Sequence, residues 1–267
     1  MTAGGTGPMA AQAEMPAGEE QTRIGELLER IARPRLCGSA GAAEVDGAIR
    51  GELERLGYEV RELPFTFSAL PGRWAVPAAG VLLALAGIIS AACAAAHNGA
   101  AALAVLAVAV ALLIVAGANA GDAIRRLPWQ RLEGVNWLAT RPGARPSYLV
   151  SAHRDSKSQA VPLLARAAAI VGALVSLAAL FLLDLVALIG PERWHLALPA
   201  VLVALVAAAA GTTLALCIVR NDSPGALDNA SGLVALLALA ARERGNPDVG
   251  FLLTDAEELG LAGASAV

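Results

Sequence analysis

Residues 99–120 read GAAALAVLAVAVALLIVAGANA, an apolar run without a single charged side chain. At about 1.5 Å of rise per residue, a helix of this length crosses a hydrocarbon core about 30 Å thick. Three other long apolar stretches occur at 75–96, 167–190 and 196–219. The sequence therefore predicts four membrane-spanning helices. The alternative is four buried helices of a large soluble core, because alanine-rich segments are only mildly apolar.

The composition agrees with a membrane protein. Of the 267 residues, 57% are hydrophobic and 16% are charged, whereas ordinary soluble domains are about 45–50% apolar and about 25% charged. The net charge of −3 provides no basic surface for nucleic acid. The three cysteines have the spacing of neither a disulfide framework nor a metal site, which excludes a disulfide-stabilised scaffold.

The spans come in two pairs with short connections at 97–98 and 191–195, so each pair is predicted to form a helical hairpin. The polar segments 1–73, 121–166 and 220–267 then lie on one side of the membrane. Basic residues near the span ends gather on this side, which the positive-inside rule assigns to the cytoplasm. They are Arg73, Arg125, Arg126, Arg131, Lys157, Arg166 and Arg220, against Arg193 on the other side.

Asp184 is the charged residue inside the third predicted span, close to the far end of that span. An acidic side chain at the centre of a membrane marks a functional site, whereas one at the interface usually has no special role. From its late position, we expect Asp184 to lie near the interface and to be structural.

The polar segments alternate between helical and strand patterns. Helices are predicted at 22–32, 42–56 and 229–244, and strands at 58–63, 134–140, 147–152 and 249–254. In the second helix, Val45, Ile49 and Leu53 lie on one apolar stripe, and Gly57 ends the helix. This alternation predicts a layered α/β sheet with its functional groups at the strand ends.

Three polar motifs stand at the ends of these elements: SAHRDS at 151–156, GALDNASG at 225–232 and TDAEELG at 254–260. Each motif alone has an ordinary explanation. His-x-Asp sequences are common, an Asp at a helix start is usually an N-cap, and paired acids in a first turn favour the helix dipole. Their order and their places at the element ends make the three together much more specific than any one.

The functional alternative is a metal site. A metal-ligating histidine usually donates its second ring N–H to a carboxylate, which fits His153 with Asp155 two residues later. Small and polar neighbours of Asp228 allow the backbone to approach a bound ion. Of Glu257 and Glu258, one would bind metal and the other would take a proton from a water molecule.

Together the motifs resemble those of the zinc aminopeptidases of peptidase family M28, and the likeness extends over 36–67 and 134–155. The resemblance implies an α/β fold with an aminopeptidase-like three-layer sheet, incomplete here and interrupted by two transmembrane helical hairpins. It implies hydrolysis of N-terminal peptide bonds by a two-metal mechanism, although peptide-cyclising transferases share the scaffold. The implied partners are a peptide substrate and membrane lipid, without nucleic acid.

The resemblance also implies a role for each motif residue. His153 binds one zinc ion, and Asp155 is the catalytic partner that orients its ring. Asp228 bridges two zinc ions. Glu257 is the general base, and Glu258 binds the second zinc ion.

The segments divide the chain into parts of an integral membrane protein with four spans and a cytoplasmic soluble part. They are a flexible tail (1–20), the N-terminal part of the peptidase domain (21–73), transmembrane hairpin 1 (74–120), the peptidase segment with the first motif (121–159), transmembrane hairpin 2 (160–219) and the peptidase segment with the second and third motifs (220–267).

The resemblance further implies one more Asp and one more His ligand beyond the third motif. His97 and His195 are predicted across the membrane and cannot replace that histidine. Because catalytic zinc usually has three protein ligands, we expect the isolated 267-residue chain to be a truncated, inactive part of a peptidase. The alternative is a non-catalytic pseudo-peptidase that acts by partner binding. An early end of the sheet would also leave strand 249–254 with an exposed edge.

Overall fold

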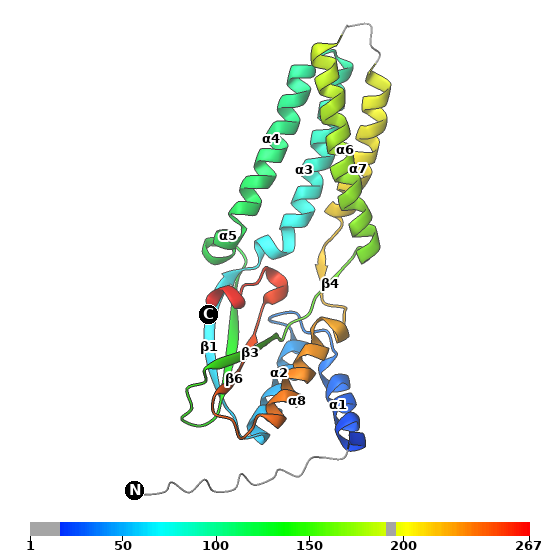
Figure 1. The fold of residues 1–267 in the computed structure, drawn as a ribbon. Helices are drawn as coiled ribbons and strands as arrows, with labels where there is room; N and C mark the ends of the chain where they lie inside the picture. The colour runs from blue at the N-terminus through cyan, green and yellow to red at the C-terminus, as the bar shows by residue number, and fades with distance from the viewer. Residues whose placement is uncertain (1–16, 191–195) are drawn as a thin grey trace, which may run out of the picture.

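The computed structural model describes residues 17–190 and 196–267 of the chain. It has two parts, a bundle of four long helices and a smaller α/β part that holds the sheet (Figure 1). Most of the predicted tail at 1–20 lies outside the described residues, and helix α1 (Ala17–Ile31) includes its last residues. The combination of helices with a small mixed sheet confirms the α/β class.

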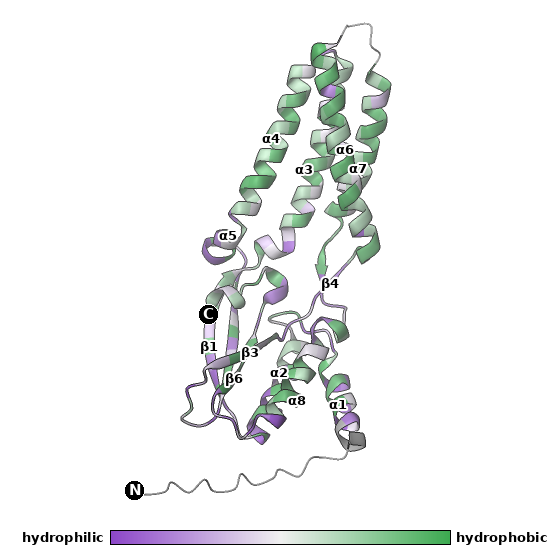
Figure 2. Ribbon diagram, in the orientation of Figure 1, coloured by the Kyte–Doolittle hydropathy of each residue, from purple (hydrophilic) through white to green (hydrophobic). Residues whose placement is uncertain are grey.

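The bundle helices are α3 (Leu70–Ala95), α4 (Gly99–Ala118), α6 (Leu163–Ile189) and α7 (Ala197–Ala215). All four are long and apolar enough to cross a membrane. In an apolar 18-residue stretch of each helix, only 22–33% is buried within the structure. Figure 2 shows hydrophobic residues along the whole length of the bundle. Helices buried in a soluble core would not expose these faces, so the structure favours the membrane alternative.

Small residues set the packing of the bundle. Gly80 of α3 and Gly211 of α7 face each other so closely that a Cβ added to either would lie 2.4–2.5 Å from the backbone oxygen of the other. A Cβ added to Gly99, at the start of α4, would lie 2.7 Å from the backbone nitrogen of Leu188 in α6. Close backbone approach through small residues is typical of helices that associate in membranes.

Asp184 lies in the last turns of α6, close to the start of α4, where a Cβ added to Gly99 would lie 2.9 Å from its backbone oxygen. Its side chain is fully buried between α6 and α3, where Ser90 Oγ lies 2.6 Å from Asp184 Oδ2. The other carboxyl oxygen, Oδ1, has no hydrogen-bond partner among the residues that the structure describes. His97 lies in the turn between α3 and α4, at the end of the bundle remote from the sheet, whereas His195 lies outside the described residues.

The sheet has the strand order β1-β2-β6-β3, with β1 (Glu59–Ser68), β2 (Arg131–Thr140), β3 (Tyr148–His153) and β6 (Val249–Thr254). The β1–β2 and β2–β6 pairs are antiparallel, and β3 pairs with β6 in parallel. Because β6 lies between β2 and β3, the expected exposed edge at 249–254 is wrong. The edge strands are β1 and β3.

Strand β1 continues to Ser68, beyond the predicted end at residue 63. Pro64 interrupts the alternating pattern in the sequence, but an edge strand tolerates proline because one side of its backbone has no partner strand. The register continues through Phe65 opposite Gly134 and Phe67 opposite Leu132. The added strand residues lead directly to the start of α3.

Three helices cover one face of the sheet: α1, α2 (Ala40–Arg55) and α8 (Ser231–Arg242). The predicted stripe of α2 is buried there, with Val45, Ile49 and Leu53 in the same core as Trp137 and Phe251. This gives a helix layer on a sheet. The aminopeptidase-like three-layer arrangement remains a prediction.

Short elements join the two parts. Helix α5 (Ala120–Arg126) follows α4, while β4 (Ser158–Gln159) precedes α6 and pairs with β5 (Val219–Arg220) after α7. An irregular turn η1 (Ala226–Ala230) precedes α8, and the 3-10 turns η2 (Glu257–Leu259) and η3 (Ala264–Ala266) follow β6. The helix predicted at 229–244 therefore begins later, at Ser231, and the paired acids of the third motif lie in a short 3-10 turn.

Candidate functional site

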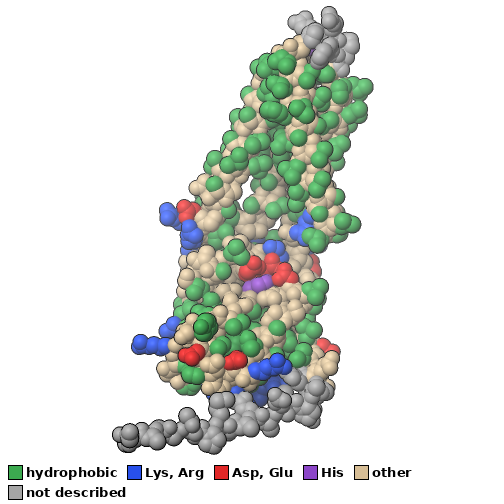
Figure 3. All heavy atoms as spheres, viewed as in Figure 1, with side chains coloured by type: hydrophobic (Ala, Val, Ile, Leu, Met, Phe, Trp, Pro, Cys, Tyr) green, Lys and Arg blue, Asp and Glu red, His purple; other side chains and the backbone are tan. Residues whose placement is uncertain are grey.

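The three motifs meet at one end of the sheet. His153 is the last residue of β3, and Glu257 follows the neighbouring strand β6. Because these two strands are parallel, their carboxyl ends lie side by side. Asp228 reaches the same place from the turn before α8. Figure 3 shows a histidine among acidic side chains on one face, at the level where the α/β part meets the bundle.

Three carboxylates surround the ring of His153. Its Nε2 is 3.0 Å from Oδ1 of Asp228 and 3.8 Å from Oε2 of Glu257. Its Nδ1 is 3.1 Å from the backbone oxygen of Asp155 and 3.4 Å from Oδ1 of the same residue. Asp155 is buried, whereas the side chain of Asp228 is exposed. The ring is thus fixed from the interior and presents Nε2 to the open side.

Asp155 also holds the third motif. Its Oδ1 accepts the backbone N–H of Glu257 at 3.1 Å, and its Oδ2 accepts the N–H of Glu258 at 3.0 Å. These donors begin the turn η2 and have no earlier backbone partner within it. One buried carboxylate therefore sets the position of the first motif relative to the third.

Arg35 is a residue of this region that the sequence analysis missed. It is fully buried, and its guanidinium donates to the backbone oxygens of Arg154 at 2.7 Å, Pro224 at 2.6 Å and Gly225 at 3.1 Å. It thereby ties the loop after His153 to the loop before Asp228. In the sequence, an arginine that follows a proline has no feature that separates a buried side chain from a solvated one.

The side chain of Glu258, the predicted ligand of the second metal ion, is paired with a lysine. Lys157 Nζ lies 2.9 Å from Oε2 of Glu258 and donates to its backbone oxygen at 2.8 Å. Among the described residues, no group of three or more His, Cys, Asp or Glu side chains is arranged to hold a metal ion. The structure brings His153, Asp155, Asp228 and Glu257 together and leaves Glu258 paired with Lys157.

The charges around His153 change the protonation of the site. Burial lowers the pKa of His153, but the hydrogen bond and charge of Asp155, with the charges of Glu257 and Asp228, raise it to about 9. Burial raises the pKa of Glu257, and nearby carboxylates add to this effect while His153 opposes it. A glutamate with a raised pKa suits proton transfer better than a fully solvated one.

The spacing of two donor atoms fits a shared zinc ion. Zinc binds imidazole nitrogen and carboxylate oxygen at about 2.0–2.2 Å, so two such ligands of a tetrahedral ion lie about 3.3 Å apart. The 3.0 Å between His153 Nε2 and Asp228 Oδ1 is close to this value. Imidazole and carboxylate are also ordinary zinc ligands. The fit extends to these two donors, since Glu258 is held by Lys157.

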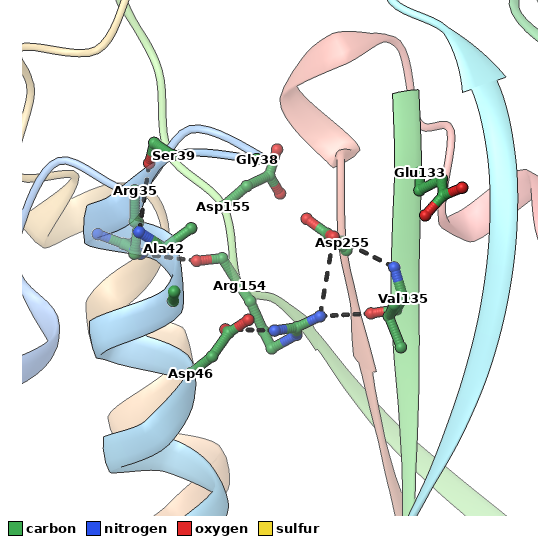
Figure 4. A pocket seen from close by; sticks show the side chains of 11 residues that line it. Arg35, Gly38, Ser39, Ala42, Asp46, Glu133, Val135, Arg154, Asp155 and Asp255 are labelled. Carbon is green, nitrogen blue, oxygen red and sulfur yellow. Dashed lines mark hydrogen bonds and ion pairs between the residues drawn. The ribbon is translucent and has the colours of Figure 1, made fainter. Parts of the chain in front are cut away.

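A polar pocket of about 260 Å³ lies on the interior side of Asp155, between α2 and the strands β2 and β6. Figure 4 shows Arg154 at its base, reaching Asp46 on one side and Asp255 and the backbone of Val135 on the other. The guanidinium also stacks on the ring of Trp137, 3.8 Å from the ring centroid. The pocket therefore has charged walls whose charges are largely paired with one another.

Residues 209–267 match the model of peptidase family M28. The match contains the second and third motifs, with Asp228, Glu257 and Glu258, and it confirms the family predicted from them. No curated protein matches the chain.

The first motif lies outside the matched M28 segment, and the structure joins it to that segment. His153 contacts Asp228, and Asp155 binds the backbone of Glu257 and Glu258. Asn229 of the M28 segment donates its side-chain N–H to the backbone oxygen of His153 at 3.2 Å. The match supports a peptidase-type function, and these contacts place residues 153–155 directly against the matched segment.

Proposed function

We propose that the chain is a membrane-anchored, zinc-dependent aminopeptidase that hydrolyses N-terminal peptide bonds. The observation that carries the proposal is the contact of His153 with Asp228 of the M28 segment, with Glu257 beside the same ring nitrogen. Four helices long and apolar enough to cross a membrane support the anchoring. In this proposal they form two hairpins, and the α/β part lies on the cytoplasmic side.

His153 and Asp228 would hold zinc, and Glu258 would complete the ligand set by leaving Lys157. The proposed full site has two ions, with Asp228 shared between them. When bound, zinc would polarise the carbonyl of the scissile bond and lower the pKa of a water molecule. Both effects favour attack on the peptide carbon.

The protein residues would position groups and move the proton. Asp155 accepts from the Nδ1 side of His153, so the ring keeps Nε2 free for the metal. Glu257 would take a proton from the attacking water and pass it to the leaving amine. Because Asp155 binds the backbone N–H of Glu257, the base is held at a fixed place relative to the imidazole.

The test is made with the full chain purified in detergent and loaded with zinc. Its substrates are fluorogenic amino-acid amides and a short peptide whose products are separated by chromatography. We expect release of the free N-terminal amino acid, which also separates hydrolysis from cyclisation. Glu257→Gln should lower kcat by at least about 100-fold without loss of bound zinc. Glu54→Gln, on the exposed side of α2, is the matched control. A zinc-loaded chain that releases nothing would contradict the proposal.

A second candidate is a non-catalytic pseudo-peptidase that binds a partner. The observation that favours it is the Lys157–Glu258 pair, which places a positive charge where the second zinc ion would be. In this case the chain would bind less than one zinc ion per molecule. Two bound ions measured by elemental analysis would exclude it.

A further inference from the structure

The candidate site is fastened to the bundle at three points. Strand β4 follows the first motif and leads to α6, while β5 follows α7 and leads to the second motif. Because β4 pairs with β5, the two segments that connect the site to α6 and α7 form one two-stranded ribbon. The third motif packs on the first turn of α3. A Cβ added to Gly72 would lie 2.5 Å from the backbone oxygen of Leu259. The site is therefore held against the ends of three apolar helices.

The same end of the bundle carries the side chains typical of a membrane surface. Trp74 and Trp129 are both exposed, and Ser68 binds the backbone of Trp129 just before α3 begins. Arg73 of α3 and Arg166 of α6 lie in the first turns of their helices. Because tryptophan and arginine concentrate at the level of lipid headgroups, the candidate site lies at that level too.

Exposed leucines border the site. Leu227, directly before Asp228, is 90% exposed, and Leu261, directly after the third motif, is 55% exposed. Leu261 also has a backbone φ of 60°, a conformation that favours glycine. Leu163 and Leu164, which begin α6 after the first motif, are 73% and 82% exposed. Figure 3 shows apolar side chains next to the acidic patch.

We propose that the substrate is the N-terminal segment of a peptide that is itself inserted in, or attached to, the membrane. The exposed leucines would contact the lipid surface from which the peptide emerges. This inference rests on the function proposed above and adds the class of substrate.

The test compares two peptides with the same N-terminal residues and fluorogenic reporter. One carries a palmitoyl chain a few residues after the reporter, and the other ends in an amide. The full, zinc-loaded chain is reconstituted in phosphatidylcholine vesicles that contain a minority of phosphatidylglycerol. We expect kcat/KM for the anchored peptide to be at least about tenfold higher, because a shared bilayer raises the effective concentration. If neither peptide is cleaved, the proposed function is contradicted. If both are cleaved with equal kcat/KM, only this inference is contradicted.

Two leucine variants show whether the preference comes from the site. The double variant Leu227→Ser, Leu261→Ser should lower the ratio of the two kcat/KM values by about threefold or more, since each leucine would lose contact with lipid. Leu149→Ser is the matched control, because Leu149 is an exposed leucine at the beginning of β3. An unchanged ratio in the double variant would overturn the inference.

A measurement that does not depend on catalysis tests whether the exposed leucines lie at the lipid surface. A fluorophore is attached through Leu227→Cys, or through Leu149→Cys as the control, after Cys37, Cys93 and Cys217 are replaced by alanine. We expect a lipid-borne nitroxide to quench the label at position 227 and not the label at 149. Quenching of the label at 227 by aqueous iodide alone would overturn the inference even if the leucine variants did not fold.

Discussion

Lys157 and Glu258 form an ion pair at the centre of the three motifs, with 2.9 Å between Nζ and Oε2. The lysine also donates to the backbone oxygen of Glu258 at 2.8 Å. Lys157 is the single lysine of the chain. In the proposed site, in which Glu258 is a zinc ligand, zinc and Lys157 would therefore compete for the same carboxylate.

Replacement of Lys157 tests this competition. Lys157→Gln should tighten zinc binding by about threefold to tenfold, because it frees a carboxylate and removes a repelling charge. Isothermal titration of the purified chain with zinc measures the change, with Arg126→Gln as an exposed control. Since no other lysine is present, acetylation of Lys157 in the wild-type chain should also increase when zinc is added. Equal zinc affinity in the two proteins would mean that Glu258 is not a ligand.

Asp155 combines two roles, and its replacement should affect both. Asp155→Ala removes a buried acceptor from the backbone N–H groups of Glu257 and Glu258 and from the His153 ring. Hydrogen bonds to a charged group contribute about 1.5–3 kcal/mol each, so we expect a loss of at least about 2 kcal/mol in stability. The thermal midpoint in detergent measures it, and Asp248→Ala on the surface is the control. Equal midpoints for the two variants would remove the structural role assigned to Asp155.

Arg35 is expected to act as a positioning residue. Arg35→Lys keeps the charge but cannot donate to Arg154, Pro224 and Gly225 with the fixed geometry of a guanidinium. It should lower zinc affinity by about tenfold, because His153 and Asp228 lose their relative placement. Arg33→Lys, at an exposed ion pair with Glu44, is the neighbouring control. If Arg35→Lys lowers the thermal midpoint and leaves zinc affinity unchanged, the residue is structural only.

The sequence contains the helices and the motifs in local patterns, which is why these could be predicted. Runs of apolar residues without charge define α4 without reference to any partner, and β6 was predicted with the bounds that the structure has, Val249–Thr254. The end of β1 depends on its place at the sheet edge, where Pro64 is tolerated. The position of a strand at the sheet edge is a property of the assembled sheet and cannot be predicted from the sequence of that strand alone.

The candidate site shows the same limit. The spacing of His153 and Asp155 indicated a ligand with its orienting carboxylate, and the structure places the two within 3.4 Å. The roles of Arg35 and Lys157 come from residues far away in the sequence, at Gly225 and Glu258. An isolated basic residue in a loop has the same local pattern whether it is solvated or buried, so only the fold could reveal these contacts.

The contact of α3 with α7 predicts an unusual cost for a small substitution. Gly211→Ala would place a Cβ 2.5 Å from the backbone oxygen of Gly80, and the two helices would have to separate. Such overpacking costs about 1–3 kcal/mol, which should lower the thermal midpoint of the chain in detergent. Gly117→Ala in α4 is the matched control, because no atom of another described element lies within 4 Å of the added Cβ. A destabilisation by both variants would indicate a general helix effect instead of this contact.

Zinc binding should depend on pH through His153, whose pKa is raised to about 9 in the metal-free chain. Zinc binds the neutral ring, so below this pKa each bound ion must displace one proton. The apparent zinc affinity should therefore rise by about tenfold per pH unit between about pH 7 and pH 8.5, and level off above about pH 9. The folding stability of the metal-free chain depends on pH in the opposite direction to the zinc affinity. The charged ring adds stability below its unfolded pKa of about 6.5, and this contribution is lost as the pH rises through about 9.

Zinc titrations at several pH values measure the affinity, and nuclear magnetic resonance of the His153 ring protons gives the pKa without metal. Asp228→Asn removes one of the charges that raise this pKa. It should therefore lower the pKa of the ring and flatten the pH dependence below about pH 9. Glu243→Gln, an exchange of the same kind remote from the ring, should change neither quantity. A zinc affinity that is independent of pH in the wild-type chain would show that His153 does not bind the metal.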